Sequence, residues 1–361
     1  MIFDNEVMKR NYFYWLDTFR FFAAFFVVLT HARFWFFQPY GLLEEESKNI
    51  FTQVLFSLTS LGGDAVVMFF ILSGFLVGGR TIEKLCNGEF ISPSSFALSR
   101  FVRIIIPLAA VLCINSVFNT IQGLPNDLWR IVGNLLCLQG AFVEPEPGIG
   151  VLWTMSYIVW FYMLILSFML IAQKQSSVAL GGICTLFLTL WVFLHTGEGL
   201  FNVVIVACGV LSYFLAKKKL CKGIYLISIV VAIFATALCH LSGESISFRS
   251  LPVDRLFFKA LQVVSYSVVI GLSVRYVPQS RWAVRFEVLM SKLSKISYSL
   301  YLIHLPVIMM MVYLGVQRLP YVSFWSLLLF LGGISVCILC AWLIYVLVER
   351  PANRLKERFQ Q

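Results

Sequence analysis

An apolar run with two ionisable residues inside it constrains this chain more than any other feature. Residues Trp15 to Phe37 read WLDTFRFFAAFFVVLTHARFWFF, long enough for a helix to cross a bilayer, and they include Arg20 and His31. A charged side chain at membrane depth costs several kcal/mol, so such residues usually face a protein interior and have a function there. Their spacing corresponds to about three helical turns, which places both side chains on nearly the same face, roughly 16 Å apart along the axis.

Composition predicts an all-α fold, a polytopic integral membrane bundle of about ten transmembrane helices. The 361 residues are 60% hydrophobic with a mean hydropathy of +0.86, and only 13% are charged, against about a quarter in soluble domains. A β-barrel would need short alternating segments, which the sequence lacks. The apolar segments near the length of a membrane span are 13–37, 54–79, 101–121, 151–173, 178–195, 200–216, 223–240, 259–277, 297–315 and 322–348.

The distribution of basic residues predicts the orientation of these spans. With a cytoplasmic N-terminus, 21 of the 28 Lys and Arg residues fall in inner segments and 7 fall outside. The outer loops instead hold Glu44, Glu45, Glu46, Glu144, Glu146 and Glu244. Such a bias is the positive-inside signal, and it requires an even number of spans with both termini in the cytoplasm. We expect a cytoplasmic segment 1–12, a transmembrane domain 13–348 and a basic cytoplasmic tail 349–361.

Cysteine usage and net charge argue against two other classes of function. The nine cysteines lie in or beside apolar runs and none shows metal-ligand spacing, so we interpret them as small buried hydrophobes and expect no metal site. The net charge of +10 comes from cations spread over many short loops, which membrane topology explains better than a nucleic-acid partner does. We expect a lipid bilayer as surroundings and no permanently bound cofactor.

The first helix has a structural alternative that must be weighed against a functional one. A lone intramembrane His can be a packing contact, and an Arg can be an anchor that snorkels to the interface. The shared face of Arg20 and His31 favours function.

A second motif, FFILSGFLVGGR, covers residues 69–80 at the end of the second span. Its Ser73-Gly74 and Gly78-Gly79 pairs remove side-chain bulk and allow a ligand or, more commonly, another helix to approach.

A third motif, SRFVRIIIP, places two arginines at the cytoplasmic start of the third span. Arg100 and Arg103 are one helical turn apart, so their guanidiniums could clamp a phosphate or pyrophosphate. Positive-inside anchoring is the competing interpretation. The position of Arg20 and Arg80 at the same predicted face favours the phosphate interpretation.

Together these motifs resemble acyltransferase family 3, the bacterial membrane enzymes that O-acetylate cell-surface polysaccharides. LDTFRFFAAFFVVLTHA matches the opening pattern of the family, in which an Asp precedes an Arg that ten residues separate from a His. FFILSGFL matches its second-helix motif and RFVRIIIP the entry to its third helix. ISYSLYLIHLPV (296–307) and VERPANRL (348–355) match its last two helices, so the similarity covers about residues 13–355.

The resemblance implies roles for particular residues. His31 would be the catalytic base. Donor contacts to acyl-CoA would come from Arg20, Ser73, Gly74, Arg100 and Arg103, with Arg80 beside them at the inner face. Supporting or acceptor-lining residues would be Asp17, Trp153, Tyr162, Tyr301 and His304. One position departs from the family: in LWTMSYIVWFY, Ile158 stands where many members carry Glu.

The function that follows is transfer of an acyl group, most simply acetyl, from cytoplasmic acetyl-CoA or another acyl-CoA to a glycan hydroxyl. The acceptor would be O-antigen, capsule, exopolysaccharide or another surface glycan, or its lipid-linked precursor, at the bacterial cytoplasmic (inner) membrane. A transporter or flippase of a glycan or glycolipid would explain the buried Arg and His equally well. It would not explain the paired cations at one face. The short loops weigh against a third interpretation, a membrane sensor or assembly partner.

The predicted orientation can be tested with single introduced cysteines. A cysteine at Glu45 or Glu144 should react with an impermeant thiol reagent added to intact cells, because both positions lie in predicted outer loops. A cysteine at Lys218 should stay unlabelled. Labelling at Lys218 without labelling at Glu45 would invert the orientation.

Overall fold

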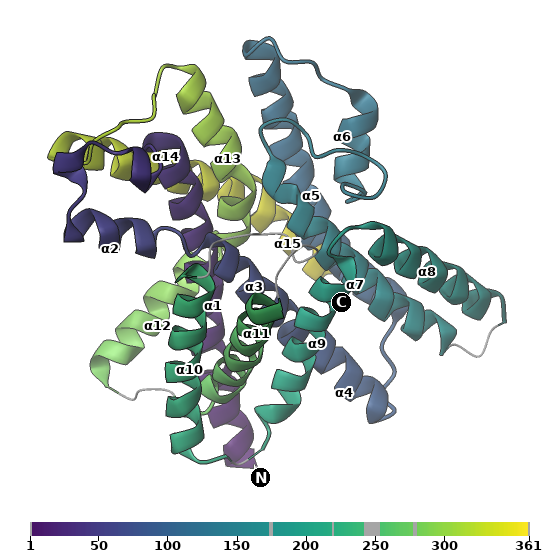
Figure 1. The fold of residues 1–361 in the computed structure, drawn as a ribbon. Coiled ribbons are helices and arrows are strands. Elements are labelled where there is room, and N and C mark those ends of the chain that lie inside the picture. The colour runs from purple at the N-terminus through teal and green to yellow at the C-terminus, as the bar shows by residue number, and fades with distance from the viewer. Residues whose placement is uncertain (1, 173–175, 219, 242–252, 277–279, 360–361) are drawn as a thin grey trace. The chain divides into compact units, whose positions relative to one another are not determined.

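The computed structural model of the chain consists of helices joined by loops in the residues it describes, which are 2–172, 176–218, 220–241, 253–276 and 280–359 (Figure 1). Between them, the described ranges contain no strand, only the isolated bridges Phe37–Leu319 and Gln139–Val143. The α-helices are α1 Ile2–Phe36, α2 Ile50–Leu58, α3 Gly62–Ser73, α4 Arg80–Cys86, α5 Pro93–Ile121, α6 Leu128–Leu135, α7 Trp153–Ile171, α8 Ser176–His195, α9 Gly199–Leu215, α10 Lys222–Leu241, α11 Val253–Ser273, α12 Arg281–Ser294, α13 Ser297–Tyr313, α14 Phe324–Ile344 and α15 Arg350–Phe359. Shorter elements are the 3-10 helices η1 Tyr40–Leu42, η2 Glu45–Ser47 and η4 Gly150–Leu152, and the π-helices η3 Gly74–Gly79 and η6 Tyr345–Glu349.

The helices confirm the predicted all-α polytopic class. Within the described residues, each of the ten predicted apolar segments overlaps helix over most of its length. Within the described residues, eight helical stretches are long and apolar enough to cross a membrane. α13 passes that test only together with α12, and α9 is an apolar helix of 17 residues. The orientation of the spans stays a prediction.

The structure also describes parts of the predicted loops, the basic tail and the nine cysteines. Between the predicted spans 101–121 and 151–173 the chain forms α6, and α15 lies within the predicted basic tail. Residues 242–252, which include Glu244 of the predicted outer loops, lie outside the described residues, as do Lys174 and Lys219, two of the 21 Lys and Arg residues predicted in inner segments. All nine cysteines are free thiols. The expectation that they are buried holds for Cys137 and Cys337, whereas Cys86, Cys113, Cys184 and Cys221 are exposed at helix surfaces and ends.

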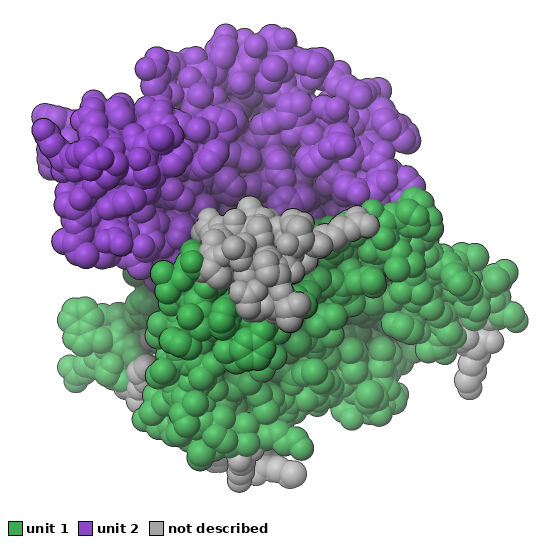
Figure 2. All heavy atoms as spheres, viewed as in Figure 1, with its two compact units in different colours: residues 1–20, 67–97, 157–292 green, residues 21–66, 98–156, 293–361 purple. Residues whose placement is uncertain are grey.

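The chain divides into two compact units, which Figure 2 shows in green and purple. Unit 1 comprises residues 1–20, 67–97 and 157–292, and unit 2 comprises residues 21–66, 98–156 and 293–361. The structure defines the packing inside each unit and not the placement of one against the other. α1 contributes its first part to unit 1 and its second part to unit 2.

In unit 1, glycines allow α9 to pack directly on the backbone of the α3–η3 helix. A methyl group at Gly74 would overlap the carbonyl oxygen of Val206, and one at Gly209 would overlap that of Ile71. Both faces therefore approach without side chains between them, the arrangement that small residues permit in membrane helices. Of the two interpretations of the Ser-Gly motif, helix packing accounts for Gly74, which is buried.

Polar contacts fix the other helices of unit 1. The Ser212 hydroxyl of α9 donates to the Ser267 carbonyl of α11 at 2.5 Å, and Arg275 Nε donates to the Ala216 carbonyl at 2.7 Å. Thr236 of α10 exchanges a hydrogen bond of 2.8 Å with the Tyr266 hydroxyl of α11. Because lipid offers no hydrogen-bond partners, such contacts specify how these helices pair.

In unit 2, the end of α1 is held by α3, α14 and the segment after α13. The Gly62 N–H donates to the Thr30 hydroxyl at 2.9 Å. The Leu319 N–H donates to the Phe36 carbonyl, also at 2.9 Å. A methyl group at Gly333 of α14 would overlap the Phe36 ring, so α14 packs closely on α1. These contacts bracket His31, which lies between Thr30 and Phe36.

The packing of α9 on α3 predicts the effect of a methyl group at Gly209. Gly209→Ala should destabilise the protein by about 1–3 kcal/mol, because the added carbon has only a backbone carbonyl to displace. Gly181→Ala in α8 is the matched control, since nothing lies within 4 Å of the carbon it adds. Thermal unfolding of the purified variants should show a lower midpoint for Gly209→Ala alone. Equal midpoints would contradict the close approach.

Candidate active site

Two histidines that are far apart in the sequence face each other in unit 2. His31 lies on α1 and His304 on α13, and His31 Nδ1 is 3.2 Å from His304 Nε2. The ring centroids are 5.1 Å apart with planes inclined at 46°. His304 is 0% exposed, whereas His31 is partly exposed. Of the two, only His31 is therefore placed to meet a substrate.

Neighbouring carbonyl oxygens determine which ring nitrogens carry hydrogen. His304 Nδ1 is 3.1 Å from the Leu300 oxygen and 2.8 Å from the Tyr301 oxygen. Since a carbonyl oxygen can only accept, we assign the hydrogen of His304 to Nδ1. His31 Nδ1 is 2.9 Å from the Val27 oxygen and carries its hydrogen for the same reason. The His304 Nε2 atom that faces it must then be an acceptor, which requires His304 to be neutral.

The nitrogen of His31 that carries a lone pair is consequently Nε2. The contacts of His31 with described residues all involve Nδ1, which leaves Nε2 available. A proton accepted at Nε2 would create an imidazolium whose Nδ1–H already points at the Val27 oxygen and at His304 Nε2. This is the arrangement of a general base with an orienting partner, although the partner here is a neutral imidazole and not a carboxylate.

Tyr301 connects α13 to the start of α7. Its hydroxyl donates to the Val151 carbonyl of η4 at 2.7 Å and makes a short contact with the Thr154 hydroxyl. Tyr301 and Thr154 are 3% and 2% exposed. Because the Tyr301 carbonyl also receives the Nδ1 hydrogen of His304, this clamp fixes the turn of helix that carries His304. Burial and three polar contacts confine the histidine to one orientation.

The structure also brings in residues that the motifs did not single out. Thr154 follows Trp153, which the sequence did propose, and Cys337 of α14 lies 3.8 Å from the His304 carbonyl. Thr154 belongs to the LWTMSY motif, and its place in that motif could have indicated it as a site residue. Nothing in the sequence indicated Cys337. Trp153 is partly buried at the first position of α7.

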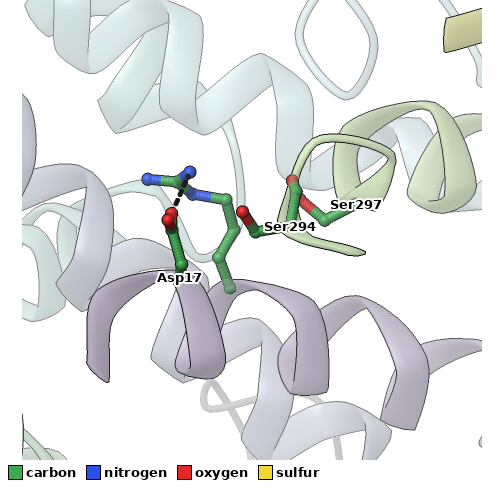
Figure 3. A network of polar contacts seen from close by, with 4 residues as sticks. Asp17, Ser294 and Ser297 are labelled. Carbon is green, nitrogen blue, oxygen red and sulfur yellow. Dashed lines mark hydrogen bonds and ion pairs between the residues drawn. The ribbon is translucent and has the colours of Figure 1, made fainter. Parts of the chain in front are cut away.

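The predicted donor residues fall into both units. Asp17 and Arg20 form an ion pair of 3.1 Å in unit 1, drawn as the dashed line in Figure 3. Ser294 and Ser297, also labelled there, belong to unit 2, where the Ser297 hydroxyl donates to the Ser294 carbonyl at 2.7 Å. Ser73, Gly74, Arg80 and Tyr162 belong to unit 1, and Arg100 and Arg103 belong to unit 2.

Exposure differs among the arginines. Arg80 and Arg103 are exposed, and Arg20 and Arg100 are partly buried. Arg100 and Arg103 lie one turn apart on α5, so they share a face of the helix, as the sequence predicted. Their participation in a donor site stays a prediction.

The departure from the family pattern is a buried apolar position. Ile158 of α7 is 7% exposed. A buried carboxylate does occur in unit 2, where Glu349 of η6 accepts a hydrogen bond of 2.8 Å from Ser299 of α13 and is 6% exposed. Within the described ranges no group of three or more His, Cys, Asp or Glu side chains is placed so that it could hold a metal ion.

A histidine with an available ring nitrogen lies on a helix that is long and apolar enough to cross a membrane, an arrangement compatible with a membrane-embedded transferase. Comparison with known families makes the class specific. The family described as an acyltransferase domain, acyltransferase family 3, matches residues 13–346, and the chain belongs to it. No curated protein and no solved structure matches the chain. The protein is thus a membrane acyltransferase.

The histidine pair predicts a specific effect of removing His304. His304→Ala should lower the acyl-transfer rate by about 10- to 100-fold, as loss of an orienting partner does elsewhere, because the His31 Nδ1 hydrogen keeps only the Val27 carbonyl as an acceptor and the ring loses its contact with α13. The KM for acyl-CoA should stay near the parent value. His195→Ala, at an exposed histidine stacked on Trp191 in unit 1, is the control. A parental rate in His304→Ala would show that the pair has no catalytic role.

Proposed function

We propose that this acyltransferase transfers an acetyl group from cytoplasmic acetyl-CoA to a hydroxyl of a surface polysaccharide or of its lipid-linked precursor, at the bacterial cytoplasmic membrane. The observation that carries the proposal is the His31–His304 pair, in which the hydrogen bonds of His31 lie at Nδ1 and leave Nε2 available. A sugar hydroxyl is a poor nucleophile at neutral pH and needs such a base within hydrogen-bond reach.

The donor would be held by its phosphates. Arg100 and Arg103 present two guanidiniums on one face of α5, and planar guanidiniums bind phosphate oxygens in pairs. Arg20 is kept in place by Asp17 and is set about three turns from His31 along α1. The flexible arm of CoA would span that depth and bring its thioester to the imidazole. Arg80, Ser73 and Gly74 remain candidates for further donor contacts.

The transfer step needs one base. The acceptor hydroxyl oxygen attacks the thioester carbonyl while its proton moves to His31 Nε2, a new C–O bond forms, and the C–S bond breaks. The CoA thiolate leaves and takes up the proton. His304 does not touch the reacting atoms; it keeps the Nδ1 hydrogen of His31 directed away from them. Tyr301 and Thr154 support His304, with Trp153 and Tyr162 as candidate acceptor-lining residues.

A cytoplasmic donor and an external acceptor explain why one helix carries ionisable groups at two depths. Arg20 and His31 lie on the same continuous helix. The phosphates of CoA need cations at the inner face, whereas a glycan hydroxyl needs a base that is reachable from the outer side. The acetyl group and the glycan acceptor rest on the family resemblance and on this division of roles.

Substitutions of the arginines should impair donor binding, whereas substitutions of His31 should impair transfer. Arg100→Ala and Arg103→Ala should each weaken acetyl-CoA binding by about 1.5–3 kcal/mol, since each removes a charge-assisted phosphate contact. Lys at either position should recover only part of the lost binding free energy, because the point charge of an ammonium group cannot reproduce the paired N–H donors of a guanidinium. Calorimetric titration of acetyl-CoA into the purified variants measures this. Parental affinity in both Ala variants would make these arginines topology anchors.

Substitutions of His31, the proposed base, are the counterpart of the arginine substitutions at the proposed donor site. His31→Ala and His31→Gln should bind acetyl-CoA like the parent yet lose about 10²–10⁴-fold in transfer, because glutamine keeps the volume but cannot take a proton. Transfer is followed by consumption of acetyl-CoA and by the mass of an added acetyl group on the surface glycan of complemented cells. A His31→Gln variant with near-parental transfer would move the base elsewhere, and His304 would be the next candidate.

A further inference from the structure

The loop between α6 and η4 is anchored by buried amide and hydroxyl groups of unit 2. Asn115 of α5 donates to the Pro147 carbonyl at 2.8 Å, and Asn134 of α6 donates to the Glu144 carbonyl at 2.9 Å. Gln139 donates to the Leu152 carbonyl at 2.6 Å, and Ser156 of α7 donates to the Cys137 carbonyl at 3.0 Å. Such a set of buried polar contacts gives the loop one conformation.

Glu146 is the acidic residue at the centre of this loop, and it is 1% exposed. Its N–H donates to the Asn134 side chain at 3.2 Å, and its Oε1 accepts from Asn119 of α5 at 3.2 Å. Its Oε2 is buried and has no hydrogen-bond partner among the described residues. A buried carboxylate with one amide donor lacks the contacts that an ionised group needs.

The charged groups around Glu146 do not replace those contacts. α5 offers the neutral Asn115 and Asn119, and α6 offers Asn134. Near the start of α6, Arg130 favours the ionised form and Asp127 opposes it. Glu144 in the loop is exposed. Burial dominates and raises the pKa of the Glu146 carboxyl above its usual value.

Short hydrogen-bonded steps connect this loop to the histidine pair. The Glu146 carbonyl accepts from the Ile149 N–H at 3.0 Å, and the Ile149 carbonyl accepts from the Leu152 N–H at 3.1 Å. That turn presents the Val151 carbonyl to the Tyr301 hydroxyl, and the Tyr301 carbonyl binds His304 Nδ1. The position of Glu146 therefore bears on the orientation of His304.

We propose that Glu146 is a positioning residue whose neutral acid form holds the loop against α5 and α6 and so keeps Tyr301 and His304 in their catalytic orientation. Ionisation of Glu146 releases the loop and slows acyl transfer. The enzyme thereby responds to pH at the face where this loop lies, the predicted outer face. The inference rests on the proposed role of His31 and adds its regulation.

The sign of the pH effect follows from the direction of the pKa shift. A carboxyl whose pKa is raised in the folded protein contributes loop stability that is fully present below its unfolded pKa and is lost as the pH rises through the raised pKa. Transfer should therefore decline on the alkaline side. Titration of the His31 base affects the acidic side, because a protonated base is inactive.

The first test compares Glu146→Gln with Glu144→Gln, a neighbouring exposed position whose side chain lies outside the network. Acetyl-CoA consumption is measured between about pH 5 and about pH 9. The parent and Glu144→Gln should lose up to about tenfold per pH unit above the titration of Glu146, whereas Glu146→Gln should keep its rate. Identical alkaline profiles for Glu146→Gln and the parent would overturn the proposal.

The second test does not depend on activity. The thiol of Cys137 is 0% exposed in the same loop, and burial raises its pKa to about 12. Labelling of Cys137 by N-ethylmaleimide, resolved by mass spectrometry and normalised to the exposed Cys221, reports release of the loop. The normalised labelling should rise with pH more steeply in the parent than in Glu146→Gln. Equal slopes would overturn the proposal, and a steeper parental slope without any transfer activity would support the release of the loop by ionised Glu146 and contradict the proposed function instead.

Discussion

The proposed chemistry depends on one hydrogen bond, from His31 Nδ1 to His304 Nε2. Two imidazoles can make this contact only if exactly one hydrogen lies between them, and the backbone carbonyls of Val27, Leu300 and Tyr301 decide which ring supplies it. The result is a base whose free nitrogen faces away from its partner. Three further contacts in unit 2 fix the helices that carry these rings: the Thr30–Gly62 bond, the Phe36–Leu319 bond and the Tyr301 clamp.

Hydropathy and charge predicted the fold class well, because long apolar helices satisfy their own backbone in lipid and leave a clear pattern. In the part of the chain that the structure describes, each expected span overlaps helix. The pattern did not predict that α13 would pass as a span only with α12, or that Gly74–Gly79 and Tyr345–Glu349 would be π-helical. Those features depend on local hydrogen-bond geometry and on neighbouring helices, to which a count of apolar residues is insensitive.

The sequence predicted individual residues of the candidate site but not the contact between His31 and His304. The sequence marked His31, Tyr301 and His304 as separate members of motifs, whereas their contact joins positions 273 residues apart. Gly74 shows the opposite case: it was placed with the donor residues, and the structure accounts for it by the approach of α9. Glu146 gave no sequence signal beyond a place in an outer loop, because its contacts come from asparagines on α5 and α6 that are distant in the sequence.

The most direct test of the central claim is the tautomer of His31. The chain has only four histidines, so nitrogen NMR of purified protein labelled with ¹⁵N-histidine can resolve each ring, and His31→Gln identifies the signals of His31 by their loss. At neutral pH the account predicts hydrogen on Nδ1 and a bare Nε2 for both His31 and His304. Hydrogen on Nε2 of His31, or a doubly protonated His304, would contradict it.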